Sequence, residues 1–323
     1  MVALEAPRDA QDPMMTSSLA RRIDLVTLQL FVAVCEEEHL TRAAERAGIA
    51  PSALSKRLAE LEATLGTELF QRHARGMSPT ASGDTLLHHA RSILRSVDKM
   101  GAELADHAQG LLGHVRILAN ISSIVQFLPD DLSDFYRANA RVRIELEERT
   151  SYAVVKGIEE GVGDIGLCVS SVDSRDLAAA PYRRDRLVLA VRRDHPLAGR
   201  ERVGFVDTLD YEHIGLHQDS AIYRRSAVEA AHAARDVKLR IHVPGFDAVL
   251  RMVESGLGVG LIPDRAFAVV ARGMDLVAIP LTDRWARREL KLVSRDPAAL
   301  PEATRLLREH LLRPEGSPPA NEG

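Results

Sequence analysis

The chain has 323 residues and a formal net charge of −4, with 46% hydrophobic and 27% charged residues. This length allows two or three domains, each with its own core, and the composition is that of an ordinary globular protein. The most apolar stretch, VRILANISSIVQFLP, is interrupted by Arg116, Asn120 and Ser122, so no transmembrane helix is expected. Cys35 and Cys168 stand far apart inside apolar runs, which predicts two core-filling thiols in a reducing compartment rather than a disulfide framework.

Both ends of the chain are polar. Residues 1–22 contain Asp, Glu and Pro where a secretory signal peptide needs an uninterrupted apolar core. We therefore expect a cytoplasmic protein with a disordered leader over residues 1–22, for which Met14 and Met15 are alternative start positions. The segment 311–323, rich in Pro and Gly, predicts a disordered tail.

Residues 24–66 show the apolar period of short helices. One face of the first helix carries Leu25, Leu28, Phe31, Val32 and Cys35. LTRAAERA forms a second helix, which Gly48 ends, and Pro51 opens a third at a position where its missing N–H costs nothing. The apolar row of the third helix consists of Leu54, Leu58, Leu61 and Leu65. The segment TELFQRHARGMSPT, with Gly76 and Pro79, predicts a hairpin or wing.

Counted from Leu40, the second and third helices meet the steric demands of a helix-turn-helix. Ala44 is small where the helices meet, Gly48 allows the positive φ of the turn, and Leu54 packs back on the first helix of the pair. Residues 23–81 are therefore predicted to form a winged helix-turn-helix DNA-binding domain. The outer face of the third helix keeps Ser52, Ala53, Lys56 and Arg57, flanked by Ser55, and its N-terminal part is what reaches base edges in this motif.

A long helix is predicted over residues 82–111, where proline is absent. Its apolar residues step by three and four: Ala90, Ile93, Val97, Met100 and Leu104. Such a narrow seam is typical of a coiled coil, so we expect a dimerisation linker helix. The alternative is a helix that packs on its own domain.

After Gly113 short apolar strands alternate with helices, as in HVRILAN, VRIELEER, DIGLCVS, RLVLAVRRDHPL and VGLIP. This alternation predicts an α/β domain with a mixed sheet over residues 114–310. Its size favours two lobes, the first formed by residues 114–185 and 282–310 and the second by residues 186–281. The fold class is thus α+β and multi-domain.

With these elements in place, the sequence resembles the LysR-type transcriptional regulators. The resemblance runs from about Asp24 to Arg295 and is densest in LQLFVAVCEEEHLTRAAERAGIAPSALSKRLAELEATLGTELFQR. It implies an N-terminal winged helix-turn-helix, a long coiled-coil linker helix and a two-lobed effector domain resembling periplasmic binding proteins. By position it places Ser55 and Lys56 on DNA, Arg72 on a phosphate and Arg75 in the wing. The predicted DNA-binding residues are Thr41, Arg42, Ser52, Ala53, Ser55, Lys56, Arg57, Arg72 and Arg75.

The sequence departs from the family pattern just before these residues. Pro51 stands where the family often has a polar residue such as Gln, and it offers no base-edge hydrogen bond. Ala50 replaces a serine and lacks a side-chain helix cap worth about 1 kcal/mol. The alternative for the exposed cations is that Lys56 and Arg57 form a solvated face paired with Glu60.

Three strand-to-helix turns of the α/β part carry small polar groups at helix N-termini. Such N-termini favour carboxylates and other acceptors, and in related folds these turns meet in the cleft between lobes. The predicted effector-binding residues are Asn120, Ser122, Ser123, Thr150, Ser151, His217, Asp219, Ser220 and Phe246. The alternative is that these residues only cap their helices, although one residue can do both.

Other motifs are weaker. GLGVG at residues 256–260 follows a helix and precedes a strand, the reverse of a dinucleotide loop, and is better interpreted as a helix C-cap. His213 and His217 have no evident third ligand, so neither a metal nor a cofactor is predicted. Peroxide-sensing members of the family use two cysteines of the regulatory domain, whereas this chain has only Cys168 there.

We therefore predict a sequence-specific transcription factor, not an enzyme, acting in the bacterial cytoplasm at the nucleoid. Its expected partners are a promoter inverted repeat in double-stranded DNA, a small-molecule effector such as a carboxylate or another polar metabolite, and further copies of itself in a dimer or, preferably, a tetramer. RNA polymerase is a candidate partner and a membrane is not. The alternatives are a DNA-binding protein without an effector and an enzyme fused to a DNA-binding segment.

Overall fold

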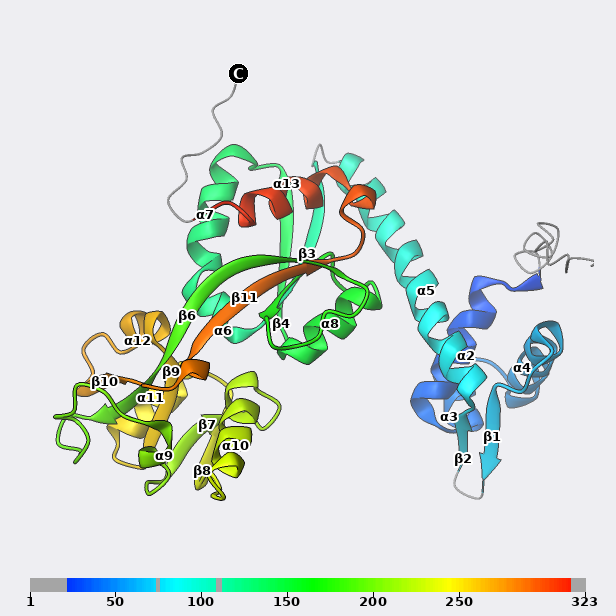
Figure 1. Cartoon of the computed structure of the whole chain (residues 1–323). Coiled ribbons are helices and arrows are strands. Elements are labelled where there is room, and N and C mark those ends of the chain that lie inside the picture. Colours follow the sequence, from blue (N-terminus) through cyan, green and yellow to red (C-terminus); the bar gives the residue numbers. More distant parts are fainter. Residues whose placement is uncertain (1–21, 74–75, 109–111, 315–323) are drawn as a thin grey trace, which may run out of the picture. The chain divides into compact units, whose positions relative to one another are not determined.

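The computed structural model describes residues 22–73, 76–108 and 112–314 and divides into two compact units, Met1–Gly101 and Ala102–Gly323 (Figure 1). The predicted leader, apart from Arg22, and residues 315–323 of the predicted tail lie outside the described residues. Within the described ranges, no helix has the length and apolar character needed to span a membrane.

The first unit contains three short helices, a two-stranded hairpin and the start of a long helix. These are α2 Leu25–Glu37, α3 Leu40–Arg46, α4 Pro51–Leu65, β1 Phe70–His73, β2 Gly76–Pro79 and α5 Ala81–Ala108. The Asp24 carboxylate caps α2 by accepting from the Thr27 N–H at 2.7 Å. Gly48 has φ of 67° between α3 and α4, and Ala50 gives α4 no side-chain cap, as predicted. The predicted winged helix-turn-helix is thereby confirmed.

The core of this unit follows the predicted row of α4 closely and that of α2 in part. Leu54, Leu58 and Leu61 are buried, while Leu65 is half-buried. On α2 the buried residues are Thr27, Leu28, Leu30, Phe31 and Val34, whereas Leu25 is 42% exposed. Val32 and Cys35 are half-buried and pack against this core, so the predicted face is correct except at Leu25. Since α2 is apolar on almost every side, its period does not show that Thr27, Leu30 and Val34 also turn inward.

The hairpin lies against the end of α2. The Met77 N–H donates to the Glu38 carbonyl at 2.8 Å, and Gly76 has φ of 144°. A Cβ at position 76 would stand 2.2 Å from the Glu38 oxygen, so only glycine fits. The strands pair Arg72 with Met77 across the ladder, which fixes the direction of the wing.

The apolar row of helix α5 is buried at its start and exposed further along. Ala90 is fully buried in the core of the first unit, so the prediction that it belongs to an intermolecular seam was wrong. Further along, Ile93, Met100 and Leu104 are 45%, 56% and 64% exposed. The exposed part of this apolar row therefore begins after Ala90.

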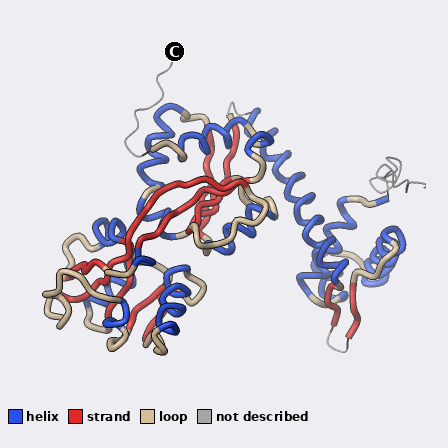
Figure 2. Tube along the Cα trace, viewed as in Figure 1, coloured by secondary structure: helices blue, strands red, loops and turns tan. Residues whose placement is uncertain are grey.

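The second unit is built on a nine-stranded mixed sheet with helices on its faces (Figure 2). Its strands are β3 Gly113–Ala119, β4 Val142–Glu148, β5 Ile165–Val169, β6 Ala178–Arg192, β7 His213–Leu216, β8 Leu239–Val243, β9 Val259–Pro263, β10 Leu276–Pro280 and β11 Arg287–Ser294. Its helices are α6 Ile121–Gln126, α7 Leu128–Ala138, α8 Ser151–Glu159, α9 Phe205–Thr208, α10 Ala221–His232, α11 Phe246–Glu254, α12 Asp264–Val270 and α13 Glu302–Leu311. Short 3-10 turns lie at Arg284–Ala286 and Pro297–Ala299.

The strand order is β4-β3-β5-β11-β6-β9-β7-β8, with β10 paired to β6. Two separate cores lie on this sheet. Lobe 1 is the core from Val115 to Tyr182 together with Leu290 to Leu311, and lobe 2 is the core from Leu187 to Ala286. Strands β6 and β11 lie side by side and run from one lobe to the other (Figure 1). They are the two strands that connect the lobes.

A buried arginine holds the end of the last helix. Arg183 on β6 has only 8% of its side chain exposed and pairs with Asp131 of α7 at 2.7 Å. Its Nη1 donates to the main-chain oxygens of Leu311 and Arg313, which α13 leaves without helical partners. Leu311 is buried, so the predicted tail began within the helix, and its first residue is a correction to that boundary.

Burial of His213 makes lobe 2 sensitive to pH. His213 lies on β7 with its ring beside Thr208 of α9, and burial lowers the pKa of His213 to about 4. In the unfolded chain the pKa is near 6.5, so the unfolded state takes up a proton first as pH falls. The free energy of unfolding is therefore unaffected by the titration of His213 above pH 6.5. It falls by about 3 kcal/mol as the pH drops toward 4.

The change is measurable through Trp285, the single tryptophan, which makes an edge-to-face contact with Phe205 next to His213. Denaturant unfolding followed by its fluorescence should show stability falling between pH 6.5 and 4 in the native chain. The variant His213→Gln, which does not titrate, is expected to show a flatter profile. An equal slope in both proteins contradicts this assignment.

Candidate functional site

The start of α4 is the exposed part of the helix-turn-helix. Ser52, Ala53 and Lys56 are exposed, and Ser55 is half-buried. The Lys56 Nζ lies 3.9 Å from a Glu60 oxygen, with 79% of the lysine side chain exposed. An ion pair of this kind contributes little, so the ammonium remains available to a phosphate or a base edge.

Arg57 is held by its own domain. Its Nη1 lies 3.0 Å from Thr27 Oγ1 and 3.3 Å from an Asp24 oxygen, at the cap of α2. The Thr27 N–H, and secondarily Arg57, lower the pKa of Asp24, while partial burial opposes them. The expected pairing with Glu60 is therefore made by Lys56 alone, and Arg57 faces α2.

The remaining predicted DNA-binding residues surround α4. Thr41 and Arg42 are exposed at the start of α3, where Arg42 donates to the Glu37 main-chain oxygen. Arg72 is exposed on β1 and, among the described residues, forms no ion pair. Arg72 and Ser55 line one groove of about 320 Å³ between α4 and the wing. Arg75 lies outside the described residues.

A small cavity lies between the two lobes, where all three predicted turns meet. It measures about 30 Å³, which is room for about one or two water molecules. Six predicted residues line it: Asn120, Ser122, Thr150, Ser151, His217 and Ser220. The lining is completed by Ile121, Glu148, Arg149, Val169, Leu216, Ala221, Ile222 and Arg288.

Three of these residues also cap helices. Asn120 Oδ1 accepts from the Ser123 N–H at 2.9 Å, Thr150 Oγ1 from the Ala153 N–H at 3.3 Å, and Ser220 Oγ from the Tyr223 N–H at 3.1 Å. Capping and cavity lining are thus done by the same side chains, because a residue that begins a helix after a strand lies at the sheet edge where the lobes face each other.

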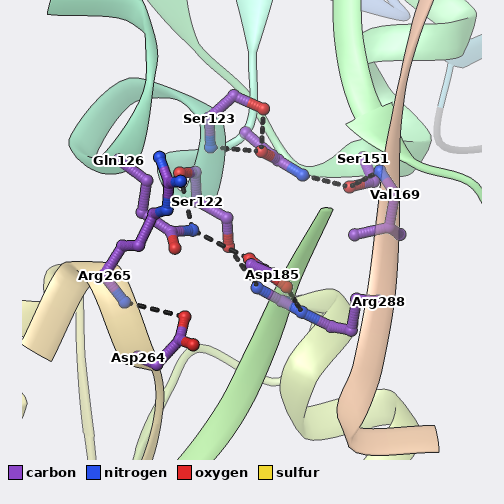
Figure 3. A network of polar contacts seen from close by, with 10 residues as sticks. Ser122, Ser123, Gln126, Ser151, Val169, Asp185, Asp264, Arg265 and Arg288 are labelled. Atoms are coloured by element: carbon purple, nitrogen blue, oxygen red, sulfur yellow. Dashed lines mark hydrogen bonds and ion pairs between the residues drawn. The ribbon is translucent and has the colours of Figure 1, made fainter. Parts of the chain in front are cut away.

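Three predicted effector residues do not line the cavity. Phe246 is 1% exposed and packs in the lobe 2 core, so its prediction was wrong: the apolar start of α11 turns inward. Asp219 is exposed and pairs with Arg224 at 2.9 Å. Ser123 is fully buried and holds Asn120 through two hydrogen bonds of 2.9 Å (Figure 3).

A charged pair lies at the bottom of this arrangement, and the sequence analysis missed it. Arg288 on β11 and Asp185 on β6 face each other across the ladder, with 11% and 0% of their side chains exposed. Gln126 donates to Asp185 at 2.8 Å, and Arg288 donates to Ser122 Oγ at 3.1 Å (Figure 3). A charge inside an apolar strand needs a buried partner, and that is the signal in RRDRLVLAV and WARRELKLV that points to this pair.

Two cation–π contacts join the lobes near the cavity. The Arg224 guanidinium carbon of α10 lies 4.7 Å from the centroid of Tyr152 on α8. That of Arg265 on α12 lies 5.0 Å from Phe127. Such a contact is worth about 0.5–1 kcal/mol at an exposed site and more where it is desolvated, so both add to the contacts that hold the lobes together.

The weaker motifs are resolved by the geometry. GLGVG ends α11, with Gly256 at φ of 77°, and leads into β9, which confirms the C-cap interpretation. Where side chains are described, no group of three or more His, Cys, Asp and Glu is placed to hold a metal ion. At the cavity rim, burial raises the pKa of Glu148, while His217 opposes the shift.

Comparison with known proteins agrees with this architecture. The family model "Bacterial regulatory helix-turn-helix protein, lysR family" matches residues 25–84, and "LysR substrate binding domain" matches residues 108–314. The uncharacterized HTH-type transcriptional regulator YbhD of Escherichia coli (strain K12) is 27% identical over 282 residues, covering 87% of this chain and 88% of its own. A probable hydrogen peroxide-inducible genes activator of Mycobacterium avium is 30% identical over 247 residues, covering 76% and 79%.

A solved structure shows the same fold over most of the chain. Full-length CbnR, crystallised in complex with its target DNA, has a TM-score of 0.64 and 20% identity, covering 90% of this chain and 99% of CbnR. Fold and site together define a DNA-binding transcriptional regulator with an effector-binding domain. The chain belongs to the LysR family.

Proposed function

We propose that this regulator reads an inverted-repeat operator with α4 of two copies and changes its DNA contacts when a small molecule enters the cavity between the lobes. The observation that supports effector sensing is that both lobes contribute residues to the lining of the cavity. Asn120, Ser122, Thr150 and Ser151 come from lobe 1, whereas His217 and Ser220 come from lobe 2. A ligand that contacts both lobes binds one lobe arrangement better than another, and this difference in affinity is what shifts the protein.

For DNA, we assign base contacts to Ser52, Ala53, Ser55 and Lys56, and phosphate contacts to Thr41, Arg42, Arg72 and Arg75. Exposure at the start of α3, the start of α4 and the wing supports this assignment for all except Ser55, which is half-buried, and Arg75, which lies outside the described residues. Arg57 is assigned a supporting role, because it ties α4 to the cap of α2. Self-association through Ile93, Met100 and Leu104 doubles the DNA contact and fits a two-fold operator.

A regulator that works on chromosomal DNA acts in the cytoplasm at the nucleoid, and we place this one there without a catalytic role. The serine hydroxyls of the cavity support the absence of catalysis. Ser122 Oγ accepts from Arg288, and Ser151 Oγ accepts from Asn120 Nδ2 and the Val169 N–H. A nucleophilic serine donates to a general base, and among the described residues neither hydroxyl has a hydrogen bond to one.

The peroxide response named for the Mycobacterium avium relative is not extended to this chain. Cys168 is fully buried, and burial raises its pKa to about 12. Cys35 is half-buried, and burial likewise raises its pKa to about 12. Both therefore remain thiols at neutral pH, whereas peroxide reacts with the thiolate.

The test begins with DNA fragments that the purified full-length chain selects from a genomic library that includes its own upstream region. These fragments should share an inverted repeat. Titration of the selected operator in the presence of a metabolite panel should reveal a ligand that changes DNA affinity by about fivefold or more.

The cavity is tested by Ala221→Leu, which fills it without removing a polar group. This variant should lose the ligand effect, while Ala231→Leu, at an exposed position just after Ala230 on the same helix, should retain it. An active ligand whose effect is the same in both variants places the sensor site elsewhere.

A further inference from the structure

The arginine in the cavity is fixed along one edge only. Arg288 Nε donates to Asp185 Oδ1 at 2.8 Å, and Nη2 donates to Asp185 Oδ2 and to Ser122 Oγ. A guanidinium has five N–H groups in one plane, and these contacts use three of them. The two N–H groups of Nη1 meet no acceptor within residues 22–73, 76–108 and 112–314.

This edge cannot turn away to find another partner. Asp185 is completely buried and also accepts from Gln126, so the carboxylate that holds Arg288 is itself immobile (Figure 3). The two residues are register partners on β11 and β6. Because Nε and Nη2 face Asp185, Nη1 lies on the opposite edge of the guanidinium, and Arg288 lines the cavity.

The hydroxyl groups around the cavity, like Nη1 of Arg288, still have hydrogens to donate. Ser122, Ser151, Thr150 and Ser220 each use their oxygen as an acceptor for an N–H group of the protein. A hydroxyl that accepts in this way still has its own hydrogen to donate. These side chains of the wall therefore present donors: two N–H groups of Arg288 and the O–H groups of the serines and threonine. The Glu148 carboxyl, which also lines the cavity, is an acceptor.

We propose that the cavity binds the carboxylate end of the effector, with Nη1 of Arg288 as the residue that selects for it. This inference rests on the proposed function, because it names the ligand class for the same cavity. A carboxylate has only acceptors and can take up several donors at once. A volume of about 30 Å³ suits this group alone, so the rest of the effector extends past Glu148 and Arg149 at the rim.

Acetate and acetamide are suitable probes, because they have nearly the same size and shape and differ in charge and in one acceptor. Saturation-transfer NMR with the full-length chain, at constant ionic strength, gives the affinity of each. The wild type should bind acetate about 10- to 100-fold more tightly than acetamide.

Arg288→Lys retains the charge opposite Asp185 but has no second donor edge, and it should lose at least about tenfold in acetate affinity. Arg149→Gln removes the other cation of the lining. It should change the acetate affinity less than about fivefold, since Arg149 is exposed and paired with Glu147. If Arg288→Lys does not fold, the double variant Asp185→Asn with Arg288→Gln removes both charges together and leaves neither buried alone. Its ratio of acetate to acetamide affinity should fall toward one.

A ratio in Arg288→Lys or in the double variant equal to that of the wild type overturns the proposal, as does the absence of acetate binding to the wild type. If a neutral metabolite acts through the cavity on DNA affinity while acetate does not bind, the carboxylate assignment is wrong and the proposed function stands. If acetate binds through Arg288 but filling the cavity leaves every effect on DNA unchanged, the carboxylate assignment stands and the proposed function is wrong.

Discussion

Replacing Lys56 with alanine is expected to flatten the ranking of operator variants, with a loss of about 1–3 kcal/mol of discrimination at the base pair it contacts. The reason is its place on α4: the side chain is 79% exposed and close to the helix start, and its ammonium has only a loose contact with Glu60. Ser55→Ala should act in the same direction with a smaller effect, because a hydroxyl contacts a base edge without a charge. Anisotropy titrations against the selected operator and its single-base variants measure the ranking.

Arg72→Ala is expected to behave differently. A phosphate contact carries no sequence information, so affinity should fall by a similar factor for every sequence, and the slope of affinity against salt should decrease by about one.

Lys156→Ala is a matched control for Lys56→Ala, because Lys156 on α8 is 70% exposed and lies 3.9 Å from Glu160, the same i,i+4 arrangement as Lys56 with Glu60. An unchanged ranking in Lys56→Ala would remove Lys56 from base readout.

Replacing Met100 and Leu104 with glutamate is expected to dissociate the oligomer and to weaken binding to the full inverted repeat by more than about 100-fold. Both side chains are more than half exposed on α5, and apolar residues at this spacing are typical of a helix seam that another copy covers. The charges would have to be buried without partners in that seam. Light scattering gives the oligomeric state, and titration of the full and half operator gives the loss of cooperation between sites.

Asp98→Lys is the control for this helix, because it changes the charge at an exposed position away from the apolar row. It should leave the oligomer intact. Binding of the double glutamate variant to a half site should remain close to that of the wild type, since α4 is untouched. A double glutamate variant that keeps its oligomeric state contradicts the assignment of this seam.

The helix-turn-helix was predictable because its demands are local. Ala44, Gly48 and Leu54 each meet a steric requirement of two adjacent helices, and the sequence separation is small enough for spacing to specify it. The inward face of α2 was predictable only in part, because a helix that is apolar nearly all round has no sharply preferred side until α3 and α4 pack on it. Ala90 was assigned to the wrong partner for a different reason: the apolar row of α5 contacts the core of the first unit at Ala90 and is exposed further along the helix.

The cavity was predictable in part. Small polar residues after a strand mark helix starts, and helix starts of an α/β sheet meet at one edge, which led to Asn120, Thr150 and Ser220. Phe246 also begins a helix, but its apolar ring gains more from the lobe 2 core than from a polar cavity. Arg288 was missed because its partner Asp185 is 103 positions away, and only the register of β6 against β11 brings them together.

The pairing of β6 with β11 also bears on how lobe 2 is joined to the rest of the chain. Arg186 and Arg287 are directly opposite each other on these strands, so the chain leaves lobe 1 and returns to it at adjacent points. Everything between them is topologically an insertion whose two ends are neighbours, an arrangement that tolerates exchange of the inserted part. Lobe 2, with its part of the ligand wall, can thus be replaced in evolution or by engineering while β11 remains paired with β5 and the sheet of lobe 1 stays complete.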